Sequence, residues 1–128
     1  MTRVTIFHNV ARDEAGHPAN FDGYTAGAPL VRVFEYDHPR AEPVEQIAEH
    51  AFYLFNVDPC HMQPDDYEIA LRYRARQLRS LSAGDVILAD DAALAIDPIG
   101  FRPIEGGQLN EVHENHYGST PLQPGQPG

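Results

Sequence analysis

The sequence has few of the residues from which disulfides, cysteine-rich metal sites and phosphate loops are built. It contains one cysteine, Cys60, and its nine basic residues are all arginine. A single thiol cannot form an internal disulfide, and this usage is typical of proteins from a reducing compartment. The absence of lysine excludes a phosphate loop of the G-x-x-x-x-G-K-[ST] type. These absences predict a cytoplasmic protein, and we expect it to bind no cofactor.

Long apolar segments are also missing. Every apolar run is far shorter than the roughly 18 residues that a membrane-spanning helix requires. The first residues, "MTRVTIFHNVARDEAGH", alternate as a strand does and then become polar, which a secretory signal does not do. We therefore expect no membrane association and no signal peptide.

Positive charge is scarce. The 19 acidic residues outnumber the 9 basic ones and give a formal net charge of −10. Such a balance disfavours general adhesion to nucleic acid or anionic lipid, although it permits a local basic patch. The length of 128 residues suits one modest core. We predict a single domain over residues 1–117 and a disordered tail, rich in glycine and proline, over residues 118–128.

The first half of the chain contains two strand patterns and then a helix pattern. Residues 3–11 and 30–37 have the alternation and β-branched content of strands, and the polar segment between them predicts a long loop. Residues 41–57 repeat apolar side chains, Phe52 among them, at spacings of three and four, which indicates a helix. Residues 65–79 suggest a second helix capped by Asp65 or Asp66, with Tyr67, Leu71 and Arg74 on one face. The end of this segment also alternates as a strand does.

The second half has the pattern of short strands. Residues 86–90 and 92–97 form two apolar runs that predict a hairpin, and residues 101–104 predict a third strand. The fold class that follows is α+β. We expect a small mixed domain with an N-terminal strand pair, one or two helices and a C-terminal antiparallel β-meander.

The segment "RSLSAGD" precedes the first of these runs. Serine and aspartate side chains accept hydrogen bonds from nearby amides, and glycine tolerates a positive φ. These properties predict a tight turn built by Ser80, Ser82, Gly84 and Asp85. The segment is neither a G-x-S-x-G nucleophile elbow nor a phosphate loop.

The same segment carries a resemblance to a known family. Residues 73–104 resemble the YodL-like domain, in which an "RSLSxxDVI/V" segment leads into a hairpin and ends in "GF" or "GW". The matching residues are Arg79, Ser80, Leu81, Ser82, Gly84, Asp85, Val86, Gly100 and Phe101. The resemblance implies an accessory module of plasmids, phages or integrative elements. It implies no particular activity.

Four arginines lie within eight residues of "RYRARQLR". Arg72, Arg76 and Arg79 share a face if the segment is helical, and Arg72, Arg74 and Arg76 share one if it is extended. Either stripe is suited to phosphates, with Tyr73 available to stack on a base. The alternative is that these arginines pair with the many carboxylates of the protein.

Histidine and cysteine offer weaker candidates. His113 and His116 have an H-x-x-H spacing that binds zinc when a third ligand is supplied, for instance by His50 or His61. Cys60 stands beside His61, but adjacent residues rarely form a nucleophile and base pair. We expect Cys60 to be a small buried apolar side chain.

These observations favour a non-enzymatic accessory or regulatory protein of a mobile genetic element that binds an unidentified protein partner. The alternative is a small nucleic-acid-binding module, similar to PUA and ASCH domains, that uses Arg72, Tyr73, Arg74, Arg76 and Arg79. Less favoured is a metal-dependent hydrolase that uses His113 and His116. No catalytic set is recognisable, and the sequence specifies no oligomeric state.

Overall fold

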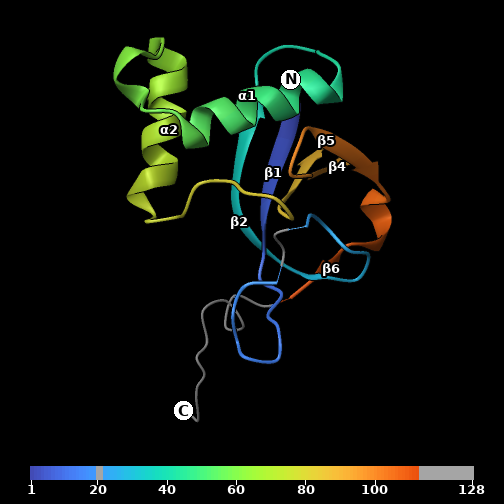
Figure 1. The fold of residues 1–128 in the computed structure, drawn as a ribbon. Helices are drawn as coiled ribbons and strands as arrows, with labels where there is room; N and C mark the ends of the chain where they lie inside the picture. Colours follow the sequence, from blue (N-terminus) through green and yellow to red (C-terminus); the bar gives the residue numbers. More distant parts are fainter. Residues whose placement is uncertain (20–21, 113–128) are drawn as a thin grey trace.

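A computed structural model of the chain describes residues 1–19 and 22–112. It contains one curled sheet in the order β5-β4-β3-β1-β2-β6, together with the helices α1 and α2 (Figure 1). The predicted α+β class, with its N-terminal strand pair and C-terminal meander, is confirmed.

The N-terminal strand pair consists of β1 (Thr2–Asn9) and β2 (Pro29–His38), which are antiparallel. The pairing register shifts between Ile6 and Phe7, and such a bulge increases the local twist of the strands. The connection between the strands is the predicted polar loop, in which Arg12 and Pro18 form an isolated bridge.

The C-terminal meander consists of β3 (Val86–Ala89), β4 (Ala92–Ile96) and β5 (Phe101–Ile104). It joins the N-terminal pair because β3 lies antiparallel beside β1, so that β1 occupies an interior place in the sheet. Asp90 takes a φ of +51° in the β3–β4 turn, which is the place where hairpins commonly have a glycine.

The structure contains one strand that the sequence did not predict. β6 (Asn110–Glu111) pairs in parallel with Pro29 and Leu30 at the start of β2, after a short 3-10 helix, η2 (Gly106–Gln108). Two polar residues cannot display the alternation that predicts a strand. The pairing instead depends on β5 and η2, which bring the following residues beside the start of β2.

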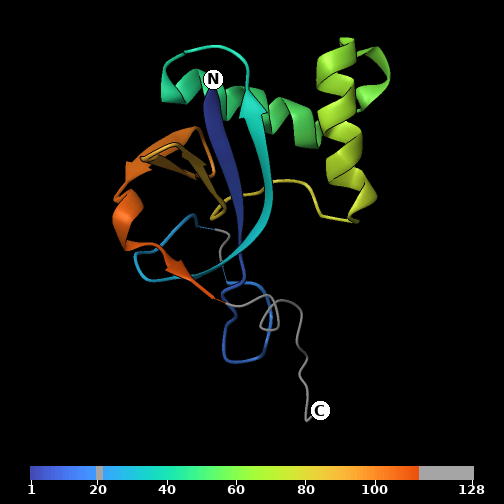
Figure 2. The same cartoon turned by 180° about the vertical axis from the view of Figure 1, so that it is seen from behind.

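The helix α1 (Val44–Asn56) begins after Pro43 and crosses one face of the sheet (Figures 1 and 2). Its buried residues recur at helical spacing and pack against the sheet. They are Ile47, Ala48, Ala51, Leu54 and Phe55. The helix predicted over residues 41–57 is confirmed, although Phe52 is 37% exposed and lies beside this apolar stripe.

The second helix, α2 (Pro64–Ala75), follows a 3-10 turn, η1 (Pro59–His61). Two details of its prediction are wrong. Its N-cap is Gln63, because Pro64 occupies the first helical position, where its fixed φ and missing N–H suit it. Its buried residues are Ala70 and Tyr73, whereas Tyr67 and Leu71 are exposed. The helix buries only these two residues, so the spacing of its apolar side chains did not identify the buried face.

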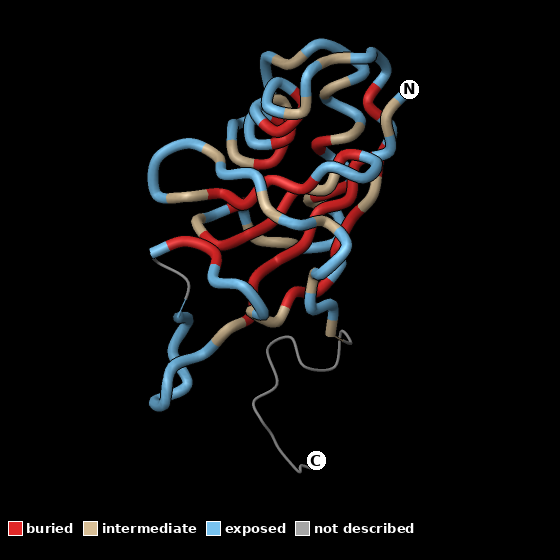
Figure 3. The backbone as a smooth tube through the Cα atoms, turned by 90° about the vertical axis from the view of Figure 1, so that its right-hand side faces the viewer, coloured by how far each residue is buried: buried red, intermediate tan, exposed pale blue. Residues whose placement is uncertain are grey.

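Two apolar clusters stabilise the sheet from opposite faces. Figure 3 shows that the buried residues gather in the interior of the molecule. Ile6, Ile87 and Leu94 face the helices, and their strand neighbours Phe7 and Val86 face the second cluster inside the curl. Adjacent residues of a strand point to opposite faces, so both faces of β1 and β3 are buried. Among the described residues, no helix has the length and apolar composition to cross a membrane.

Candidate functional site

The "SLSAGD" segment is a turn organised around one buried carboxylate. Asp85 is fully buried and accepts hydrogen bonds from the backbone N–H groups of Asn9 and Ser82, each at 2.8 Å. The Arg79 guanidinium binds both of its carboxylate oxygens, at 2.7 and 2.8 Å. Gly84 has a φ of +94°, and its N–H donates to the Ile96 carbonyl at 2.7 Å. The turn therefore connects β1, β4 and the chain after α2.

The serines of this turn contribute little to it. Ser80 and Ser82 are exposed, and the Ser82 hydroxyl is only within 3.5 Å of Arg79. Leu81, between the two serines, is buried, and its backbone exchanges two hydrogen bonds with the Asn56 side chain at the end of α1. The turn is thus a structural connection, and its hydroxyls face outward.

Tyr73 is 1% exposed and is not available to stack on a base. Its ring stacks on Phe55 with 4.1 Å between centroids, and its hydroxyl donates to the Arg79 carbonyl at 2.6 Å. His8 Nε2 lies 2.8 Å from the same hydroxyl. The predicted binding role of Tyr73 is therefore wrong, because the side chain anchors α2 to the sheet.

Arg74 and Arg79 are also committed to the fold. The Arg74 guanidinium donates to the Leu54 and Val57 carbonyls at the end of α1, at 2.9 and 2.7 Å, and to its own helix at Ala70. A cation at this position satisfies carbonyls that lack helical partners and complements the helix dipole. Because Arg79 binds Asp85 and Arg74 binds the end of α1, neither of the two predicted stripes of three arginines exists as one surface.

Arg72 and Arg76 face a cleft beside the edge of β2, which we name the arginine cleft. Its volume is about 380 Å³. The residues that line it are Arg3, Arg32, Val33, Phe34, Glu35, Arg72 and Arg76. The Arg76 guanidinium donates to the Val33 carbonyl at 2.6 Å, and the Arg72 guanidinium lies 5.6 Å from the Phe34 ring centroid. Arg3 and Arg32 were not predicted, because about 70 and 40 residues separate them from α2.

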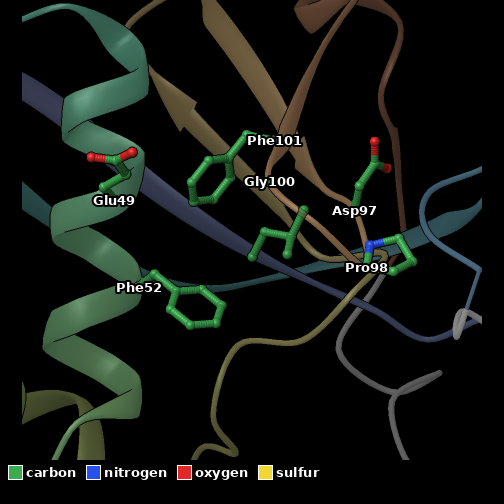
Figure 4. Close-up of a pocket in the computed structure, with 7 residues that line it drawn as sticks. Glu49, Phe52, Asp97, Pro98, Gly100 and Phe101 are labelled. Carbon is green, nitrogen blue, oxygen red and sulfur yellow. The ribbon is translucent and has the colours of Figure 1, made fainter.

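A second hollow lies between α1 and the β4–β5 turn, and we name it the apolar groove. Its volume is about 260 Å³. It is lined by Glu49, Phe52, Ile96, Asp97, Pro98, Gly100 and Phe101. Figure 4 shows Phe52 on α1 and Phe101 on β5 pointing towards each other, and their ring centroids are 6.5 Å apart. Gly100 and Phe101, which carry the family resemblance, thus belong to this groove.

The rim of the apolar groove exposes one large apolar side chain. Ile99 lies between the lining residues Pro98 and Gly100 and is 93% exposed. Gly100 has a φ of +79°, which closes the four-residue turn through a hydrogen bond from the Asp97 N–H to the Gly100 carbonyl. The turn thus presents Ile99 to solvent.

A partly buried polar cluster connects the end of β2 to both helices. His38 Nε2 lies 2.6 Å from Glu42, His50 Nε2 lies 2.9 Å from Asp66, and the two imidazole rings are 5.1 Å apart. Three buried atoms among the described residues have no hydrogen-bond partner, and all belong to this region: the Tyr36 hydroxyl and Nδ1 of His38 and His50. Burial raises the pKa of Tyr36, with a smaller contribution from the Asp66 carboxylate.

The remaining candidates from the sequence provide no site. His113 and His116 lie outside the described residues, and within residues 1–19 and 22–112 no group of three histidine, cysteine or acidic side chains is placed to hold a metal. Cys60 is exposed, which corrects the expectation of burial. Partial desolvation, and then the Asp58 carboxylate, raise the pKa of Cys60, whereas a nucleophilic cysteine needs a lowered one.

Comparison of the chain with protein-family models, with curated proteins and with solved structures gives no match in any of the three. The resemblance to the YodL-like domain stays a prediction. The functional conclusions below therefore depend on the geometry of the two hollows.

Proposed function

We propose that this chain is a non-enzymatic accessory protein of a plasmid, phage or integrative element that binds a protein partner through the apolar groove. One observation carries this proposal: Phe52 and Phe101 line the groove while Ile99 stands fully exposed at its rim. A buried apolar anchor surrounded by polar residues is the usual centre of a protein interface. The family resemblance is consistent with such an accessory role.

The charges beside the groove indicate the chemistry of the partner. Glu49 and Asp97 contribute carboxylates to its lining, and Glu45 lies exposed one turn earlier on α1. Asp97 is paired with Arg102 at 3.3 Å, whereas Glu49 forms no ion pair with another described residue. The partner segment that fits carries an apolar side chain for the groove and a neighbouring lysine or arginine for Glu49.

Selection from a displayed peptide library tests this proposal. Peptides enriched on the parent protein should combine an apolar residue with a nearby basic one. Their affinity should fall at least about tenfold for Ile99→Ser and for Glu49→Gln, because each change removes part of the contact surface. Leu71→Ser is the matched control, since Leu71 is an exposed aliphatic side chain on α2. Enriched peptides that bind Ile99→Ser as well as Leu71→Ser would refute the proposal.

Nucleic-acid binding is the weaker candidate. Of the five residues expected to carry it, Tyr73, Arg74 and Arg79 are engaged in the fold. Of the five, only Arg72 and Arg76 line the arginine cleft, and a groove for single strands combines several cations with exposed aromatic rings. Metal-dependent hydrolysis by His113 and His116 remains a prediction on residues outside the described part of the chain.

A further inference from the structure

The arginine cleft concentrates positive charge in a protein with a net charge of −10. Four guanidinium groups and one carboxylate, that of Glu35, line it. The two sides of the cleft differ, because Arg3 and Arg32 come from the sheet, whereas Arg72 lies on α2 and Arg76 is the C-cap residue of that helix. The charge that is available to a ligand depends on which of the four arginines are paired with carboxylates.

The arginines of the sheet are neutralised. Glu35 lies 3.1 Å from Arg3 and 2.6 Å from Arg32. Arg3 also reaches Asp37 at 3.2 Å, and Arg32 binds both oxygens of Glu111 at 3.0 and 3.1 Å. Hydrogen bonds from Arg3 and then Arg32 lower the pKa of Glu35, so this carboxylate remains charged. Its role is to brace the two arginines.

The arginines of α2 are not neutralised. Within the described part of the chain neither Arg72 nor Arg76 forms an ion pair, although carboxylates are abundant in this sequence. Their separation of four residues places like charges on one face of the helix, which is unfavourable. Both are nevertheless held in place, Arg76 by the Val33 carbonyl and Arg72 by the Phe34 ring. Two guanidinium groups without an ion-pair partner match the charge of a phosphate dianion, and guanidinium groups donate well to phosphate oxygens.

The surroundings favour a small ligand over a polyanion. A neighbouring acidic hollow, which Arg72 also lines, carries the carboxylates of Asp37, Asp65, Asp66 and Glu68. A nucleic-acid backbone continuing along α2 would meet these negative charges. The cleft volume of about 380 Å³ lies within the range of small-molecule sites, roughly 300–1,000 Å³. We infer that the arginine cleft binds the terminal phosphate group of a small phosphorylated ligand, with Arg72 and Arg76 as its principal donors.

Isothermal titration calorimetry at constant ionic strength tests this inference, with inorganic phosphate and phenyl phosphate as the ligands. We expect saturable binding that weakens at least about tenfold in Arg72→Gln/Arg76→Gln. The control Arg12→Gln/Arg40→Gln removes the same charge elsewhere and should bind as the parent does. Arg72→Gln alone should also weaken binding, and it removes no hydrogen bond from the fold, so loss of Arg76 from the Val33 carbonyl cannot explain its effect.

Two outcomes would overturn the inference. Equal weakening in the control variant would show only a general response to charge. Binding of a twelve-nucleotide single strand without binding of either phosphate would instead assign the cleft to nucleic acid. The arginine cleft and the apolar groove share no lining residue, so either result leaves the peptide experiment independent.

Discussion

Asp85 is the residue on which the turn after α2 depends. Its carboxylate is fully buried, and it binds the Arg79 guanidinium and two backbone N–H groups. Removing this carboxylate costs far more than removing an exposed hydroxyl, because two backbone N–H groups and the partly exposed Arg79 guanidinium lose their acceptor. The residues that match the family pattern therefore differ widely in importance.

Asp85→Ala should lower the free energy of unfolding by about 3–5 kcal/mol. Ser80→Ala should change it by less than about 0.5 kcal/mol, because Ser80 is exposed and its hydroxyl has no role in the turn. Urea denaturation followed by circular dichroism measures both values. A loss below about 1 kcal/mol for Asp85→Ala would show that the turn does not depend on this carboxylate.

Two buried tyrosines, Tyr36 and Tyr73, differ in the hydrogen bonds that their hydroxyls form. Tyr73→Phe removes contacts to His8 and to the Arg79 carbonyl and should cost about 1–3 kcal/mol. Tyr36→Phe removes a buried hydroxyl that has no partner and should be neutral or stabilising. Thermal unfolding of both variants beside the parent measures the difference. Equal destabilisation by both changes would contradict this explanation.

At the scale of elements, α2 is held by single side chains that reach its neighbours. Tyr73 enters the core, and Arg74 reaches the end of α1. This arrangement explains why the sequence of α2 did not distinguish clearly between a helix and a strand. A helix that buries two residues leaves little periodic signal, whereas α1 buries five at helical spacing and was predicted over its whole length.

Arg74→Ala should destabilise the protein by about 1–2 kcal/mol, because the carbonyls at the end of α1 lose their charged donor. Arg72→Ala, in the same helix, should cost less than about 0.5 kcal/mol. Amide hydrogen exchange locates the effect, which should be faster exchange in the last turn of α1. Unchanged exchange in that turn would refute the capping role.

The elements themselves were largely predictable, but their neighbours were not. Alternation and turn residues identified β1 to β5, since both signals are local in the sequence. The pairing of β1 with β3 and the meeting of Arg3 and Arg32 with α2 bring together residues that are distant along the chain. The arginine cleft was therefore half predicted, through Arg72 and Arg76, and the apolar groove only through Gly100 and Phe101.

For the whole molecule, stability should depend on acidity through His8. Burial lowers the pKa of His8 to about 4, while Asp85 and Arg79 make smaller, opposing contributions. In the unfolded chain this imidazole has its ordinary pKa of about 6.5, so the unfolded state binds more protons between these values. The free energy of unfolding should therefore fall as the pH is lowered from about 6.5 to 4, by up to roughly 3 kcal/mol.

His8→Gln isolates this contribution, because glutamine retains an N–H donor near Tyr73 but does not titrate. Urea denaturation at several pH values should give a shallower decline for the variant than for the parent. Glu35, whose pKa the arginines lower, adds a loss of stability in acid that both proteins share. Parallel curves for the two proteins would show that His8 does not titrate on unfolding.

The interior place of β1 has a consequence for synthesis on the ribosome. Among the described strands β1 is translated before the others, yet its second neighbour, β3, begins more than eighty residues later. Until then the β1–β2 hairpin has an unpaired, apolar edge, and such edges favour association with other chains. The nascent chain must therefore delay completion of its sheet until residues 86–89 have been translated, and a chaperone that shields the hairpin during this interval would raise the yield of folded protein.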